Sequence, residues 1–193
     1  MEARLRRPAP EELDDGQRAV YEAITSGPRS SGPQAFPLTD ERGRLRGPFN
    51  AMLLSPTVGL ALQGLGGAVR YGSALGDRAR EMAILAVAAH WHSTFERDAH
   101  EAVGRAVGLT EPEMAALRAG VSPDLADTEE AAAVRATHLL LRHGSLSEQE
   151  YGAAVAALGE RGLFDVTTLV GYYATLALQL RVFAGEARGA ADG

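Results

Sequence analysis

The chain has 193 residues, 46% of them hydrophobic, and its 19 basic and 25 acidic residues give a net charge of −6. Its length predicts one domain, residues 1–193, and the absence of any basic run longer than the Arg6-Arg7 pair argues against a nucleic-acid partner. There is no cysteine and every basic residue is an arginine, so disulfides, thiol catalysis and Schiff-base chemistry are excluded.

The N-terminal segment, MEARLRRPAPEELDD, lacks the apolar stretch of a signal peptide, so a cytoplasmic protein is expected. A first helix is predicted from Pro10, because proline is favoured at the first helical position and apolar residues then recur on one side. Residues 27–47 are rich in Gly, Pro and Ser and form a loop longer than most helix connections. Because loops of this length are usually either disordered or functional, this one is a candidate cover for a site.

Helices are predicted for the rest of the chain, because no segment alternates with the period of a strand. A short helix at PFNAMLLS precedes a longer one from Ser55-Pro56 to about Tyr71, and Asp77 is a candidate cap for the next. The capping-box pattern Ser/Thr-x-x-Glu marks three later helix starts, at Ser93, Thr110 and Ser147. Glycines typical of helix ends lie at Gly108, Gly120, Gly144 and Gly162.

The last predicted helix, DVTTLVGYYATLALQLRVFAGE, is apolar on nearly all sides, which indicates burial in the core or between subunits. Its uncharged part, 166–180, is too short to span a bilayer comfortably, so no membrane contact is expected. Together these elements predict an all-α domain of about seven or eight helices, with no linker that divides it.

Three of the five histidines lie in the stretch EMAILAVAAHWHSTFERDAHE, residues 81–101. Glu96 and His100 are one helical turn apart, so the carboxylate would favour the imidazolium and hold one ring nitrogen. Glu81 begins an otherwise apolar helix, where a carboxylate must reach solvent or find a partner. Glu81, Glu96 and His100 are therefore candidate acid/base residues.

Structural explanations compete with this chemical one. As the last member of a capping box, Glu96 would only accept the backbone N–H of Ser93. His90 and His92 flank a break between two helices, where an imidazole can reach solvent, and Trp91 is typical of a core or interface anchor. Each of these residues can be explained without a function.

A metal site is the third alternative. His92, Glu96 and His100 are spaced i, i+4, i+8, which on one continuous helix would form a single stripe of nitrogen and oxygen ligands. A helix that starts at Ser93 places His92 outside it and breaks the stripe. The sequence therefore favours a site without a metal.

The order of these residues resembles the carboxymuconolactone decarboxylase family, which is related to the alkylhydroperoxidase D-like proteins. Members of that superfamily carry a Glu, a Cys-x-x-Cys that begins twelve residues later, and a His four residues after the second Cys. Here the residues at those distances from Glu81 are Ser93, Glu96 and His100. Three longer segments also resemble decarboxylase-type members: GPFNAMLLSPTVGLALQGLG, REMAILAVAAHWHSTFERDAHE and GLFDVTTLVGYYATLALQL. The resemblance implies a helical bundle of the alkylhydroperoxidase D-like type.

The resemblance implies a decarboxylase that needs no cofactor. Ser93 and Glu96 replace the paired thiols of the peroxidase-type relatives, so thiol peroxidase activity is excluded on chemical grounds. In the family's named reaction, a lactone with two carboxylates loses one as CO2, and its own carbonyl accepts the electrons. Decarboxylase-type relatives commonly have Trp after the Phe/Tyr-Glu pair, where this chain has Arg97, and this departure leaves the exact substrate open.

The roles of the residues follow from the resemblance and from their chemistry. His100, oriented by Glu96, is expected to act as the general acid, and Glu81 to orient His100 or to serve as a second acid. Arg80 is expected to bind the carboxylate that the substrate retains. The other predicted substrate-binding residues are Trp91, His92 and Phe95.

Other functions stay open at this point. The same groups could catalyse a proton shift, dehydration or rearrangement on another small molecule in a biosynthetic pathway. A non-catalytic member of the family would bind a small acid or serve as a subunit of an assembly. The resemblance also implies a homo-oligomer, a trimer or hexamer, with which the apolar last helix is compatible.

Overall fold

The computed structural model describes residues 4–27 and 36–184 of the chain. In that part of the chain it contains eight α-helices and no strand, which confirms the all-α prediction and the expected number of helices. The helices are α1 (Asp15–Thr25), α2 (Pro48–Met52), α3 (Pro56–Tyr71), α4 (Asp77–His90), α5 (Thr94–Ala106), α6 (Glu111–Arg118), α7 (Thr128–His143) and α8 (Glu148–Gln179). A 3-10 turn, η1 (Pro10–Glu12), precedes α1, and a π-helical turn, η3 (Leu180–Ala184), continues α8.

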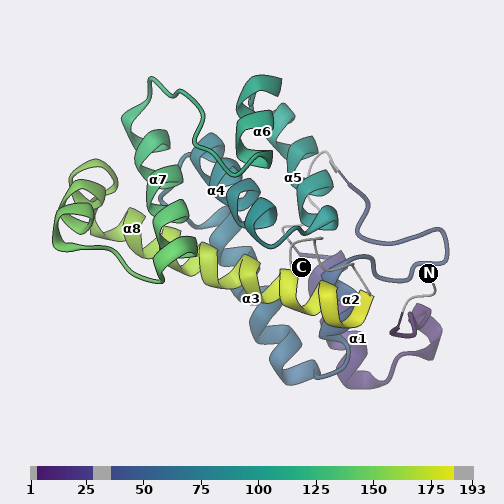
Figure 1. Cartoon of the computed structure of the whole chain (residues 1–193). Helices are drawn as coiled ribbons and strands as arrows, with labels where there is room; N and C mark the ends of the chain where they lie inside the picture. The colour runs from purple at the N-terminus through teal and green to yellow at the C-terminus, as the bar shows by residue number, and fades with distance from the viewer. Residues whose placement is uncertain (1–3, 28–35, 185–193) are drawn as a thin grey trace, which may run out of the picture.

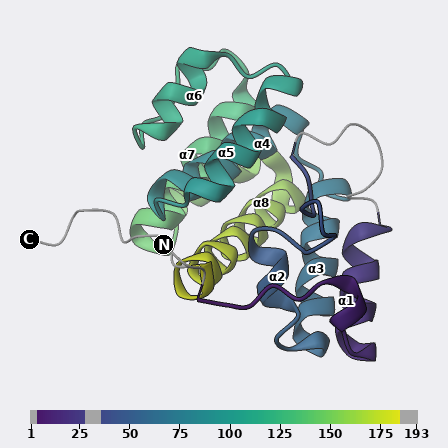
Figure 2. The same cartoon turned by 90° about the vertical axis from the view of Figure 1, so that its right-hand side faces the viewer.

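Helix α8 runs between two groups of helices, with α1 to α3 on one side and α4 to α7 on the other (Figures 1 and 2). It packs against α2, α3, α4 and α7. Helix α4 is also central, because it contacts α5, α6, α7 and α8 and every residue from 79 to 88 is buried. A helix covered on all sides offers no solvent to a charged side chain, so any charge on α4 needs a partner inside the protein.

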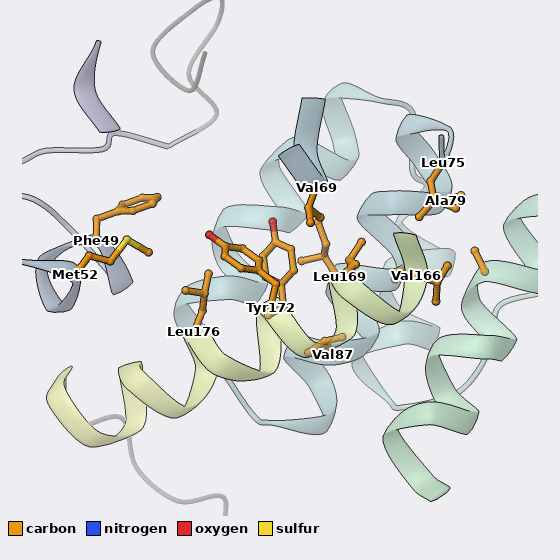
Figure 3. Close-up of a cluster of buried hydrophobic side chains, with 14 of the residues drawn as sticks. Phe49, Met52, Val69, Leu75, Ala79, Val87, Val166, Leu169, Tyr172 and Leu176 are labelled. Atoms are coloured by element: carbon orange, nitrogen blue, oxygen red, sulfur yellow. The ribbon is translucent and has the colours of Figure 1, made fainter. Parts of the chain in front are cut away.

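The core forms along the inner face of α8. Figure 3 shows Leu169, Tyr172 and Leu176 of α8 in the same buried cluster as Val69 of α3 and Val87 of α4. Burying each such side chain stabilises the fold by roughly 1.5–3 kcal/mol. The segment 148–183 is long and apolar enough to cross a membrane by length and composition alone, but 44% of its apolar window is buried inside the bundle. Its place in the core therefore accounts for part of its apolar character.

Two predicted helix starts differ from the structure. The helix expected from Pro10 is interrupted: η1 ends at Glu12, and α1 begins only at Asp15, where the carboxylate of Asp14 accepts the backbone N–H of Gln17 at 2.8 Å. Asp77 does not cap α4, because the cap residue is Gly76 and Asp77 is already helical. Its carboxylate instead accepts a hydrogen bond from Arg80, one turn further along.

The predicted helix ends are confirmed at three glycines and wrong at the fourth. Gly108, Gly120 and Gly144 all have positive φ and follow α5, α6 and α7. Gly162 lies inside α8, where a Cβ atom would come within 3.0 Å of the Leu158 Cβ, so its small size serves packing. The break in α8 is at Gly159 instead, where φ is 69°, a conformation that glycine adopts at little cost.

Only part of the predicted 27–47 loop can be placed, because residues 28–35 lie outside the described residues. The part from Phe36 onward turns around Asp40, whose carboxylate accepts the backbone N–H groups of Arg42 and Arg44, both at 3.0 Å. The ring of Phe36 packs edge-on against Phe95, with centroids 5.9 Å apart. This end of the loop therefore lies against the first turn of α5.

Candidate functional site

Glu81, Glu96 and His100 meet in the interior of the protein, where α4 supplies Glu81 and α5 supplies the other two. His100 Nδ1 lies 2.6 Å from Glu81 Oε2, and His100 Nε2 lies 3.4 Å from Glu96 Oε2. The three residues are 0%, 3% and 2% exposed, in chain order. The structure thus brings together all three predicted catalytic residues, in the order Glu81–His100–Glu96, which we call the relay.

Glu96 is not a helix cap, so the purely structural explanation of this residue is wrong. Helix α5 does begin after Ser93, as the sequence pattern predicts, but the Ser93 side chain makes no capping hydrogen bond. The backbone N–H of Ser93 donates to the carbonyl oxygen of Ala88 at 2.9 Å, because the chain turns tightly out of α4. Glu96 is therefore free of the cap and contacts His100.

Burial disfavours the charged forms of both Glu81 and His100. In each residue, the interaction with its partner outweighs this effect of burial. Burial raises the pKa of Glu81, yet the charge and hydrogen bond of His100, with Arg70 and Arg80, bring the net pKa below its ordinary 4.5. Burial lowers the pKa of His100, yet the charges and hydrogen bonds of Glu81 and Glu96 bring the net pKa above its ordinary 6.5. The two shifts together favour an imidazolium held by a carboxylate.

Each carboxylate of the relay has a second oxygen that does not bind His100. Glu81 Oε1 lies 3.8 Å from the Nε atom of Arg80. Glu96 Oε1 is buried and has no hydrogen-bond partner among the described residues. A buried carboxylate oxygen without a donor is costly, so Glu96 Oε1 is well suited to accept a hydrogen bond from a bound ligand.

Sequence reasoning missed two residues beside the relay. The ring of Tyr173, on α8, meets the His100 imidazole edge-on, with centroids 5.1 Å apart, and Tyr173 is 3% exposed. Arg70 lies in the last turn of α3; burial lowers its pKa, but Tyr173, Glu81 and other neighbours raise the net pKa. Arg70 is the one charged residue of α3, and this lone charge on an apolar helix was the available signal.

The two arginines that the sequence singled out have carboxylates of the protein itself as partners. Arg80, expected at the retained carboxylate of the substrate, donates to Asp77 Oδ1 at 2.7 Å and lies beside Glu81. Arg97, the departure from the family pattern, donates from its Nε and Nη2 atoms to Asp98 Oδ1. Arg97 thus interacts with its neighbour in the chain rather than with Glu96.

Of the three other predicted substrate-binding residues, Trp91 and His92 lie in the turn between α4 and α5, and Phe95 lies in the first turn of α5. The guanidinium of Arg181 stacks over the ring of Trp91, 5.6 Å from its centroid. His92 is exposed and has a left-handed backbone, with φ 51°. Phe95 is half-buried and lines a cavity near the end of α8. Phe95 thus lines a cavity and also belongs to α5, the helix that carries Glu96 and His100.

The metal alternative depends on a continuous helix that does not form. Because α5 starts at Thr94, His92 lies outside it and does not share a stripe with Glu96 and His100. Within residues 4–27 and 36–184, no group of three or more His, Asp or Glu side chains is arranged to hold a metal ion.

Comparison with known proteins identifies relatives of the segment that contains the relay. Residues 56–139 match the model of the carboxymuconolactone decarboxylase family. A crystal structure of an alkylhydroperoxidase AhpD core, an uncharacterized peroxidase-related protein from Ralstonia eutropha JMP134, is similar with a TM-score of 0.73 and 14% identity. The similarity covers 97% of this chain and 93% of that chain, and at this identity it shows a shared fold. No curated protein has a significant match to the sequence.

Proposed function

Because residues 56–139 match the model of the carboxymuconolactone decarboxylase family, and the chain has the alkylhydroperoxidase D-like fold, we propose that it is a cofactor-independent carboxy-lyase. Its substrate would be a small carboxylated lactone or a related oxygenated acid. The buried relay supports this function most directly, because it holds an imidazolium between two carboxylates in the interior. Such a relay can store a proton and deliver it.

The geometry suggests a separate task for each member of the relay. Glu81 binds His100 Nδ1 at 2.6 Å, so it fixes the ring and stabilises the imidazolium. His100 Nε2 faces Glu96 at a longer 3.4 Å, so a proton can pass from the ring to that carboxylate. Glu96 is the end of the relay, and its unpaired Oε1 is the atom that meets the substrate.

The reaction requires one proton and no outside electron acceptor. When the bond between the substrate carbon and its carboxylate breaks, CO2 leaves and the bonding electron pair moves toward the lactone carbonyl as an enolate. A proton from His100 is taken up at Glu96 Oε2, the carboxyl group turns to present it, and it then returns to carbon, which gives a product that keeps its remaining carboxylate. His100 regains a proton from water, and general acid catalysis of this kind contributes about 10²- to 10⁴-fold.

The direct test measures CO2 release and loss of absorbance with 4-carboxymuconolactone. Wild-type protein should turn over, and His100→Ala should lose at least about 10²-fold in rate while it keeps its helical signal. A matched control is His143→Ala, because His143 is an exposed histidine at the end of α7. Full activity in His100→Ala would overturn the role of the relay. No turnover by the wild type would overturn this substrate and favour another proton transfer on an oxygenated acid.

We also propose that the protein is a homo-oligomer, which would fit either a catalytic or an assembly role. Large apolar side chains are exposed on two helices, with Val58 at 61% and Leu65 at 41% on α3, and Phe164 at 68% and Leu178 at 47% on α8. Exposed apolar patches of this kind often mark contacts between subunits. Light scattering coupled to size exclusion should give a trimer or hexamer, and a mass near 20.3 kDa would contradict this.

A further inference from the structure

A cavity of about 250 Å³ lies where the N-terminal segment, α2, the start of α5 and the end of α8 meet. It is somewhat smaller than the roughly 300–1,000 Å³ pockets that hold drug-sized ligands, so it suits a smaller molecule. Its wall contains two arginines, two amides and two aromatic rings. These residues are Arg7, Arg46, Asn50, Gln179, Phe95 and Phe183.

The rim of this cavity is positively charged although the whole chain is acidic. The segments 4–7 and 40–46 carry six arginines and two acidic residues, against a net charge of −6 for the chain. Arg7 is held in place, because its Nε donates to the carbonyl oxygen of Leu45 at 3.0 Å and its Nη2 lies 3.2 Å from Asp40. Arg46 is exposed at the cavity wall. Such a rim attracts an anion, and guanidinium groups bind carboxylates through paired hydrogen bonds.

Two buried acceptors add a second requirement for the ligand. Asn50 is 7% exposed, and its Nδ2 donates to the carbonyl oxygen of Arg6 at 3.1 Å, which fixes the orientation of the amide. Asn50 Oδ1 and Gln179 Oε1 are buried and have no hydrogen-bond partner within the described residues. Unpaired acceptors of this kind favour a ligand that carries a hydroxyl donor as well as a negative charge.

The cavity and the relay share a turn of α5. Phe95 lines the cavity, and the next residue, Glu96, is the end of the relay. Gly47 allows the Phe95 ring to approach closely, because a Cβ atom at Gly47 would lie only 2.1 Å from the Phe95 Cζ atom. A ligand in the cavity would therefore lie against the first turn of α5, the turn that also carries Glu96.

We propose that this cavity binds a carboxylate that the substrate keeps, with Arg46 and Arg7 as its charged partners and Asn50 and Gln179 as acceptors for a hydroxyl group. This assignment rests on the proposed function and narrows it, because the substrate must then carry at least two carboxylates, and a hydroxyl group on it would strengthen its binding. One carboxylate stays in the cavity while the other is lost at Glu96.

The test uses 3-hydroxyadipate as the probe and follows its binding to isotope-labelled protein by NMR titration. Wild-type protein should bind it, and the side-chain amide signals of Asn50 and Gln179 should shift. Arg46→Gln should weaken binding by about tenfold or more through loss of a charged hydrogen-bonding partner. Arg142→Gln is the matched control, because it removes the same charge from an exposed arginine in the last turn of α7, away from the cavity, and should leave the affinity unchanged.

Two related compounds separate the contributions of charge and hydroxyl. Adipate, which lacks the hydroxyl, should bind more weakly, and dimethyl adipate, which lacks the charges, should not bind. The assignment would be overturned if 3-hydroxyadipate did not bind, or if Arg46→Gln bound it as tightly as the wild type does. It would also be overturned if dimethyl adipate bound as tightly as adipate. If binding depends on Arg46 but the protein shows no turnover, only the decarboxylase proposal is contradicted. If turnover is unaffected by Arg46→Gln, only the assignment of the cavity is contradicted.

Discussion

The starts of α5 and α8 carry the same sequence pattern and use it differently. At α8, Ser147 and Glu150 form a capping box: the Ser147 hydroxyl accepts the backbone N–H of Glu150, and the Glu150 carboxylate accepts the backbone N–H of Ser147 at 2.8 Å. At α5, Ser93 makes no such bond and Glu96 contacts His100. A capping pattern therefore predicts where a helix starts more reliably than it predicts what its glutamate does.

The backbone in front of each helix explains the difference. Ser147 follows an open turn, so its N–H has no carbonyl partner and takes the glutamate side chain. Ser93 follows α4 directly, and its N–H is already bonded to Ala88. A glutamate that is not needed at the helix start and faces the interior must find another partner, which here is an imidazolium.

The largest expected contrast is in activity between Glu96→Gln and Glu150→Gln. Both changes remove one carboxylate and keep the shape of the side chain. Glu96→Gln should lower turnover by about 10²- to 10⁴-fold, because glutamine cannot pass on a proton, whereas Glu150→Gln should keep wild-type turnover. Rates with 4-carboxymuconolactone, with circular dichroism as the folding control, measure both. Similar rates for the two variants would remove the functional distinction between the helices.

An effect of intermediate size is expected in the pH dependence of the protein's stability, to which the relay contributes. The pKa of His100 is higher in the folded protein than its ordinary 6.5, so His100 stabilises the fold fully below pH 6.5. This stabilisation is lost as the pH rises through the folded-state pKa. The pKa of Glu81 is lower in the folded protein than its ordinary 4.5, so Glu81 stabilises the fold fully above pH 4.5. This stabilisation is lost as the pH falls through the folded-state pKa. The relay therefore stabilises the fold most between about pH 4.5 and 6.5.

Urea unfolding of wild type and His100→Gln from pH 5.5 to 9 measures this contribution, because glutamine does not titrate. The stability advantage of the wild type should shrink as the pH rises. An advantage that stays constant over this range would show that His100 does not hold its proton more tightly in the folded state.

The smallest effect is expected at the true cap. Ser147→Ala removes the hydroxyl that accepts the N–H of Glu150 and should destabilise the protein by about 1 kcal/mol, with no change in turnover. Thermal or urea unfolding measures it. A loss of activity in this variant, at a temperature where it remains folded, would contradict the separation between cap and relay.

The helices could be predicted from the sequence largely because their signals are local. Proline at Pro56, the capping residues Thr110 and Ser147, and glycine at Gly144 each act on their own neighbourhood, and the structure places helix ends at all four. Gly162 was misread because its role is to allow packing, which no local pattern reports.

The site could be predicted only where chain spacing implies proximity. Glu96 and His100 share a face of one helix, so their contact follows from the i, i+4 spacing, and the resemblance added Glu81. Arg70 and Tyr173 reach the relay from α3 and α8 through tertiary packing. The arginine-lined cavity also depends on tertiary packing and could not be predicted, because its walls come from segments more than a hundred residues apart.

The most direct test of the relay is the protonation state of His100 itself. Nitrogen-15 histidine NMR of the intact protein, with His100→Gln to assign the signal, reports both ring nitrogens between pH 5 and 9. We predict that both nitrogens stay protonated well above pH 6.5, because two buried carboxylates hold the imidazolium. A neutral His100 at pH 6.5 would contradict the relay as a proton store, and with it the proposed mechanism.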